Sequence, residues 1–164
     1  MSDSSLSDSS RHLLRHAIAT VAYRGGKALR GAPEGFADFQ TAEGSRTPSQ
    51  IVAHMCDLFD WALSLVKGAQ KWHGSDPLPW DKGSQRFFAA LEALDAFLAS
   101  GAPLGCSPDQ LLQAPIADAL THIGQICLLR RLAGAPVRAE NYLMAEIMAG
   151  RAGQLQAAPR MEFD

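Results

Sequence analysis

Residues Ile51–Leu65, IVAHMCDLFDWALSL, have the spacing of an amphipathic helix that carries a histidine in its apolar stripe. At about 3.6 residues per turn, one face collects the apolar side chains of Ile51, Met55, Leu58, Ala62 and Leu65. His54 points the same way, whereas Asp57 and Asp60 point away and are expected to be solvated. Burying an imidazole is costly without a partner. We therefore expect His54 to meet a hydrogen-bond acceptor, a metal ion or a substrate.

The rest of the chain also has helical spacing, and no sustained strand-like alternation interrupts it, so we expect an all-α fold. The expected architecture is a four-helix bundle of up-and-down or crossover type. Its helices are predicted at residues 10–29, 48–67, 84–100 and 115–134, with an additional short helix after Ser107 and a C-terminal helical segment at 138–149. The predicted organisation is a flexible leader (1–9), one helical domain (10–153) and a loosely held tail (154–164).

Two helix starts are marked by the same pattern. In TPSQ, Thr47 is the expected N-cap and Gln50 completes a capping box; in SPDQ, Ser107 and Gln110 have the same roles. At its other end, the fourth predicted helix is followed by Gly134 and Pro136, which favour termination. These signals set the helix boundaries.

Composition excludes several function classes. The net charge is -2, and the 15 basic residues form no dense cluster, so a nucleic-acid-binding role is not expected. No apolar run approaches the ~18 residues of a membrane span, and the start lacks the pattern of a signal peptide, so we expect a cytoplasmic protein. Cys56, Cys106 and Cys127 are widely spaced, which predicts reduced thiols rather than disulfides or a zinc ribbon.

A second histidine lies on the fourth predicted helix. This helix is apolar on nearly every side, which predicts a central position in the bundle. Asp118 and His122 are four residues apart and share a face, and Gln125 continues it. Two histidines and a carboxylate on facing helices form a common divalent-metal ligand set, in which Gln125 would orient a ligand or hold a water molecule. His54, Asp118 and His122 are therefore candidate ligands of a metal site.

Two other interpretations remain open for these residues. Asp118 is in the first turn of its helix, where a carboxylate stabilises the helix dipole without any metal. His54 would also be satisfied by a hydrogen bond to Asp118 or to a backbone carbonyl. The remaining histidines have simpler expected roles: His12, His16 and His73 are predicted to be solvated.

Three segments together resemble the DinB/YfiT-like superfamily of four-helix-bundle metalloproteins: RTPSQIVAHMCDLFDWAL, ADALTHIGQICLLRRLAGAPV and ENYLMAEIMAG. Members typically place one histidine on the second helix and an HxxxH pair on a later helix, often followed by a Gly-Gln step. His54 matches the first ligand and His122, in HIGQ, matches the last. Asp118 stands where the family usually has histidine, a departure that favours harder ions.

The resemblance implies a divalent ion (zinc, nickel, iron or manganese) and a small-molecule substrate. Relatives include enzymes that use the thiols bacillithiol or mycothiol in S-transfer or in isomerising maleylpyruvate. We therefore expect a metal-dependent enzyme of thiol-transfer or hydrolytic type that uses a low-molecular-weight thiol. The alternative is a non-catalytic small-molecule-binding or stress-related protein without a functional metal, which the aspartate at position 118 favours. The loops around Trp72 and Trp80 suggest a homodimer.

Overall fold

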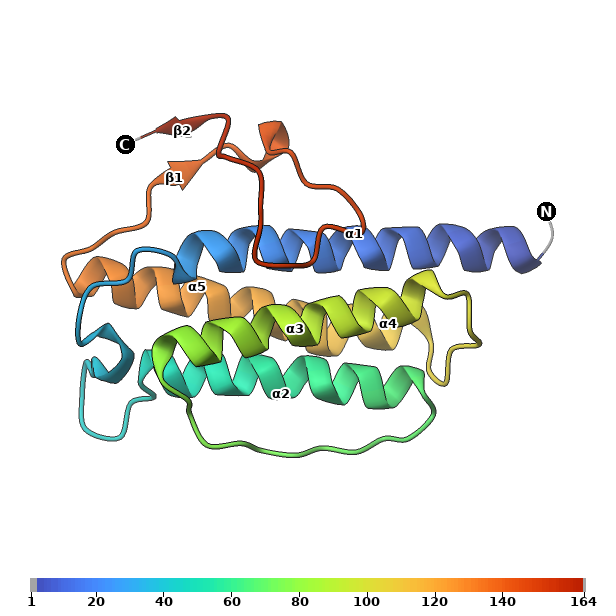
Figure 1. The fold of residues 1–164 in the computed structure, drawn as a ribbon, viewed down its shortest axis with the longest axis horizontal. Coiled ribbons are helices and arrows are strands. Elements are labelled where there is room, and N and C mark those ends of the chain that lie inside the picture. The colour runs from blue at the N-terminus through green and yellow to red at the C-terminus, as the bar shows by residue number, and fades with distance from the viewer. Residues whose placement is uncertain (1–2, 164) are drawn as a thin grey trace.

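Four long helices pack side by side around one core among residues 3–163, the part of the chain described by the computed structural model (Figure 1). They are α1 (Asp3–Leu29), α2 (Pro48–Val66), α3 (Trp80–Ala99) and α5 (Ala117–Leu132). α1 and α2 each pack against both α3 and α5, so the four helices surround a shared interior. The expectation of an all-α fold is confirmed, although α1 begins before residue 10 and α3 before residue 84.

The interior is filled by aliphatic and aromatic side chains from all four helices. The largest of the fully buried residues are Tyr23, Phe59, Phe87, Ile18, Met55, Leu91, Leu94, Leu98, Leu111, Ile116, Ile126 and Val21. Burial of this surface is the main stabilising contribution to the fold. Gly25 allows a close approach of α1 to α3, because a Cβ there would lie 2.7 Å from Cε1 of Phe87. The glycine that weakens α1 locally thus lets the α3 aromatic ring pack on its backbone.

Both predicted capping boxes are present. The hydroxyl oxygens of Thr47 and Ser107 accept from the backbone N–H of Gln50 and Gln110, whose side chains bond back to the cap residues. Pro115, however, does not begin a helix as expected. α4 (Pro108–Leu111) continues through the π-helical turn η2 (Leu112–Ile116) into α5, and Pro115 lies inside that wider turn. The π-helical turn accommodates the missing proline N–H without ending the helix.

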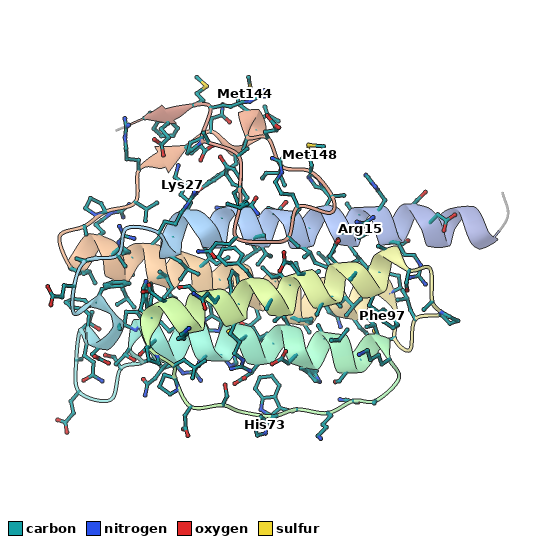
Figure 2. All side chains as sticks on the ribbon, viewed as in Figure 1. Arg15, Lys27, His73, Phe97, Met144 and Met148 are labelled. Carbon is teal, nitrogen blue, oxygen red and sulfur yellow. The ribbon has the colours of Figure 1, made fainter. Side chains whose placement is uncertain are left out.

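Residues 67–79 form a crossover that returns along α2, so α2 and α3 run in the same direction (Figure 1). His73 lies on this segment and is exposed (Figure 2). Trp80, at the end of the crossover, turns inward: its indole N–H donates to the Leu29 carbonyl, and its ring packs edge-on against buried Phe36. Trp72, on the crossover itself, is half exposed.

The C-terminal segment is not the helix predicted at 138–149. It contains β1 (Ala139–Glu140) and the 3-10 turn η3 (Tyr142–Met144), and β1 pairs antiparallel with β2 (Glu162–Phe163). Buried Glu140 accepts hydrogen bonds of 2.7 Å from the Tyr23 hydroxyl and from Lys27 Nζ on α1. These contacts, with the strand pairing, hold the segment extended against α1, which helical periodicity could not reveal.

Part of the tail predicted to be loosely held is anchored by the same cluster. Lys27 Nζ also lies 2.7 Å from a carboxylate oxygen of Glu162, which belongs to β2. Arg130 on α5 caps the neighbouring end of α1, where its guanidinium donates to the carbonyls of Ala28, Arg30 and Gly31. The C-terminal end of α1 is therefore held by two sets of polar contacts, one around Lys27 and one around Arg130.

α5 is not central on every side, contrary to the prediction from its composition. Its inner face carries buried Ile123 and Ile126, whereas Thr121, Gln125 and Leu128 are exposed to solvent. A helix in a ring of four has an outer face, and here several apolar residues occupy it. Within residues 3–163, no helix combines the length and the apolar character required to cross a membrane.

Candidate metal centre

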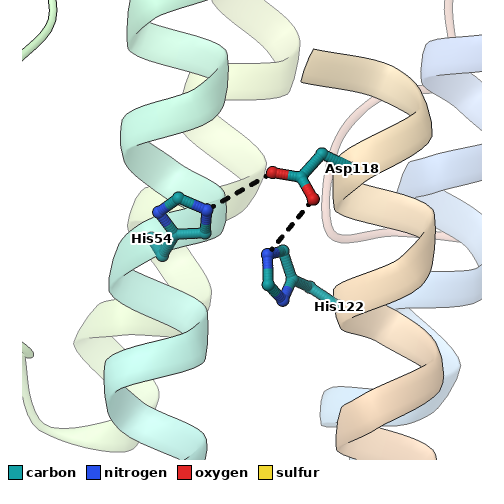
Figure 3. Close-up of side chains that lie close together, drawn as sticks. All are labelled: His54, Asp118 and His122. Carbon is teal, nitrogen blue, oxygen red and sulfur yellow. Dashed lines mark hydrogen bonds and ion pairs between the residues drawn. The ribbon is translucent and has the colours of Figure 1, made fainter. Parts of the chain in front are cut away.

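The three predicted ligands come together between α2 and α5 (Figure 3). His54 projects from α2, and Asp118 and His122 project from consecutive turns of α5. His54 is not buried as its place in the stripe predicted: its side chain is 23% exposed and lies at the edge of the core. The site is therefore at the solvent-facing rim of the α2–α5 interface.

The carboxylate of Asp118 presents one oxygen to each imidazole. Its Oδ2 lies 3.4 Å from His54 Nε2, and its Oδ1 lies 3.4 Å from His122 Nε2 (Figure 3). The two imidazole rings are nearly perpendicular, with centroids 4.8 Å apart. Both Nε2 atoms thus converge on one carboxylate.

Gln125 determines how His122 faces this carboxylate. Nδ1 of His122 lies 2.8 Å from Oε1 of Gln125. Because an amide oxygen only accepts, Nδ1 donates in this contact, and Nε2 is the nitrogen that faces Asp118. Nε2 and Oδ1 lie 3.4 Å apart, and either a metal ion or a proton on Nε2 would join them.

The donor set fits a divalent ion. With metal–ligand bonds of ~2.1 Å, ligand atoms at the corners of a tetrahedron lie ~3.4 Å apart, and each imidazole Nε2 lies at this distance from a different oxygen of Asp118. One donor atom from each residue lies within 4.8 Å of the others. This largest separation between donor atoms is longer than a tetrahedral edge. Rotation of the partly exposed His54 and Asp118 side chains would bring the donor atoms closer together. Gln125 supplies the outer hydrogen bond typical of metal-bound histidine.

The electrostatics keep His54 in its metal-binding form. Burial and the neighbouring His122 lower the pKa of His54 by more than Asp118 raises it. The neutral imidazole is the form that coordinates metals. Asp118 itself is the most open of the three, with 44% of its side chain exposed.

Two tryptophans wall the His54 side of the centre. The Trp72 ring on the crossover lies 5.7 Å from the His54 ring and 5.9 Å from that of Trp61 on α2, measured between centroids. No sequence pattern predicts this contact, because Trp72 belongs to an irregular segment whose path along α2 is set by tertiary packing.

Asp57 fixes the crossover, and its expected solvated position is wrong. It is buried, accepts from both the N–H and the hydroxyl of Ser75, and pairs with Arg86 of α3 at 2.8 Å. Burial raises the pKa of Asp57, but the hydrogen bonds from Ser75 and Arg86 outweigh it and hold the pKa below its ordinary value. Asp57 is therefore an ionised anchor for the loop.

The three remaining histidines lie at the surface, as predicted. His12, His16 and His73 are exposed, and none of them belongs to the group formed by His54, Asp118 and His122. The three cysteines are free thiols, as expected.

Comparisons of this chain with protein-family models, with curated proteins and with solved structures give no match. The site is therefore interpreted from its own geometry.

Proposed function

We propose that this chain is a DinB/YfiT-like four-helix-bundle metalloprotein that catalyses thiol-dependent transfer on a small molecule. His54, Asp118 and His122 would hold a divalent ion of the zinc, nickel, iron or manganese type. The observation that carries the proposal is the pair of imidazole nitrogens facing one carboxylate, with His122 Nε2 turned toward it by the contact between Nδ1 and Gln125.

Each residue has a distinct task in this proposal. His54 and His122 bind through Nε2, Asp118 neutralises charge, and Gln125 fixes the tautomer and orientation of His122. Trp72 and Trp61 shield the His54 side from water, while the exposed edge of Asp118 admits the substrate. A divalent ion with an open position would polarise a carbonyl and lower the pKa of a bound thiol or water.

The surroundings favour thiol transfer over hydrolysis. A hydrolytic site commonly uses a protein group as general base, and the nearby carboxylate of Asp57 is engaged by Ser75 and Arg86. The chain's own thiols are not activated either. Burial raises the pKa of Cys56 to about 12 and also raises that of Cys106 and Cys127. A low-molecular-weight thiol bound as a substrate would bring its own nucleophile.

The alternative is a non-catalytic small-molecule-binding protein in which no metal takes part. The specific observation that favours it is the same carboxylate: a proton on His122 Nε2 would let Asp118 bond to both histidines without an ion. The two proposals therefore differ in which cation lies between His122 and Asp118.

Metal content and metal-dependent stability separate the two. Protein purified without chelator is analysed for bound elements, and its unfolding is followed while zinc, nickel, manganese or ferrous ion is titrated into the metal-free form. Mass action predicts that ions binding the folded state raise the melting temperature with concentration. His54→Ala and His122→Ala should lose the bound ion and the rise in melting temperature.

His73→Ala and His12→Ala are the matched controls, because both remove an exposed imidazole from another part of the surface. They should retain wild-type metal content and stabilisation. If all four variants keep both properties, the metal centre proposal is wrong. For the metal-loaded wild type, consumption of a small thiol in the presence of an electrophile tests the transfer activity, with His122→Ala as the inactive reference.

A further inference from the structure

A cavity lies on the other side of α5 from the metal centre. It has a volume of about 220 Å³ and is enclosed by α5, the end of α1 and the segment after α5. α5 lines it with Leu120, Gly124, Cys127 and Arg131, whose spacing places them along one helical stripe. The volume is below the ~300–1,000 Å³ of pockets for drug-sized ligands, so it suits a small molecule.

Arginine side chains surround this cavity. Arg24 and Arg131 line it, and among residues 3–163 neither guanidinium has a carboxylate partner or a hydrogen bond. Arg138 lines it as well and reaches Glu162 at 3.5 Å. Buried Arg130, which donates only to carbonyls, adds a further uncompensated charge nearby. Positive side chains therefore border the cavity.

The Arg24 guanidinium is held ready for a ligand. Its Cζ lies 4.2 Å from the centre of the Tyr142 ring, and Tyr142 is itself packed edge-on against Tyr23. Stacking uses the face of the guanidinium and leaves the N–H groups at its edge free to donate. Tyr142 thus orients Arg24 and also offers an apolar wall to the cavity.

Gly124 keeps space open within the cavity wall. A Cβ at this position would meet no atom within 4 Å, so packing does not require the glycine. Glycine inside a helix costs about 1 kcal/mol relative to alanine. At Gly124 the helix is less stable than it would be with alanine, although a side chain would fit there. We interpret the open space beside Gly124 as room for a ligand.

We propose that this cavity binds a small organic oxyanion, a carboxylate or a phosphate ester, through the guanidiniums of Arg24 and Arg131. Guanidinium forks match the two oxygens of either group, and charge-assisted bonds of this kind are about twice as strong as neutral ones. The apolar part of the ligand packs on Leu120 and the Tyr142 ring. This site is independent of the metal centre, which uses the α5 face toward α2.

Calorimetric titration of the full chain tests the proposal with matched probes: phenyl phosphate, benzoate, inorganic phosphate and neutral benzyl alcohol. At least one organic anion should bind saturably with 1:1 stoichiometry, and benzyl alcohol should not bind. The tighter of phenyl phosphate and benzoate identifies the headgroup. Arg24→Gln and Arg131→Gln should each weaken that probe tenfold or more, since each removes charge-assisted bonds.

Two further variants locate the binding. Gly124→Leu should block the cavity and abolish binding. Lys67→Gln removes one exposed positive charge at the C-terminal end of α2, away from the cavity, and should leave the affinity within twofold of wild type. Because Arg131 is exposed and Arg24 partly so, their variants keep the helical circular dichroism of the wild type and remain informative if Gly124→Leu fails to fold.

Alkylation gives an independent reading of the site. The bound anion should slow modification of Cys127, which lines the cavity, relative to Cys106, as followed by peptide mass spectrometry. The proposal is overturned if no organic anion binds, if the arginine variants bind as tightly as Lys67→Gln, or if Cys127 is not protected. A failed metal titration has no bearing on these outcomes.

Discussion

His54 Nε2 lies 3.4 Å from Asp118 Oδ2 across 64 positions of sequence, and this contact joins α2 to α5 at the candidate centre. The same carboxylate reaches His122 one turn further along α5. A single side chain therefore links two imidazoles from different helices.

Replacing Asp118 tests this link directly. Asp118→Asn removes the anionic ligand and should weaken metal binding by at least about tenfold, since even outer hydrogen-bond partners contribute ~10–100-fold. Asp118→His restores a three-histidine set and should retain binding, with a shift of preference toward zinc. Competition with a chromogenic chelator gives the affinities. Asp109→Asn, an exposed carboxylate in the first turn of α4, is the matched control and should behave as wild type.

Gln125 should act through His122. Gln125→Ala frees the His122 ring to rotate and to exchange tautomers, so metal affinity should fall by roughly 10–100-fold. Gln125→Glu keeps an acceptor on Nδ1–H and should hold affinity near the wild-type value. The Nδ1 and Nε2 resonances of His122 in ¹⁵N NMR report the tautomer. If the alanine variant retains both the Nδ1–H tautomer and the affinity, Gln125 has no positioning role.

The attachment of the crossover to the helices should depend on Asp57. Asp57→Ala leaves the Ser75 N–H and the Arg86 guanidinium without their acceptor in a mostly buried position, which costs roughly 2–3 kcal/mol of unfolding free energy. Urea unfolding measures the loss. Asp60→Ala removes the exposed partner of Arg86 and should cost less than about 1 kcal/mol. Equal losses for the two variants would contradict the anchoring role of Asp57.

The same residue predicts a pH dependence. The folded-state pKa of Asp57 is depressed below its ordinary value of 3.8, so its contribution to stability is complete above that value. That contribution is lost as the pH falls from about 3.8 through the lower folded-state pKa, where the folded protein takes up the proton. The difference in unfolding free energy between wild type and Asp57→Asn should shrink over this acid range. A difference that stays constant below pH 3.8 would argue against an ionised Asp57.

Local signals accounted for most of what the sequence predicted. Thr47 with Gln50, and Ser107 with Gln110, begin helices because a capping box requires only residues three positions apart. Asp118 and His122 share a face of α5 because residues four apart do so on any helix. The pairing of this face with His54 was also predicted, from the chemistry of the three residues.

Contacts between residues far apart in the sequence account for the features that the sequence did not predict. Asp57 is buried because Ser75 and Arg86, from a loop and another helix, converge on it. Residues 138–149 have helical spacing, but Tyr23 and Lys27 hold Glu140 on an extended path over α1. Pro115 stays within a continuous helix because a π-helical turn accommodates it.

The sequence by itself determined the four main helices, two capped starts and the shared α5 face of Asp118 and His122, since these follow from contacts between residues a few positions apart. Only the tertiary structure decided that His54 lies at the rim rather than in the core, that Trp72 walls it, and that Arg24 and Arg131 border one cavity. Those relationships depend on how whole helices and loops pack, and side-chain burial across separate elements has no periodic signature in the chain.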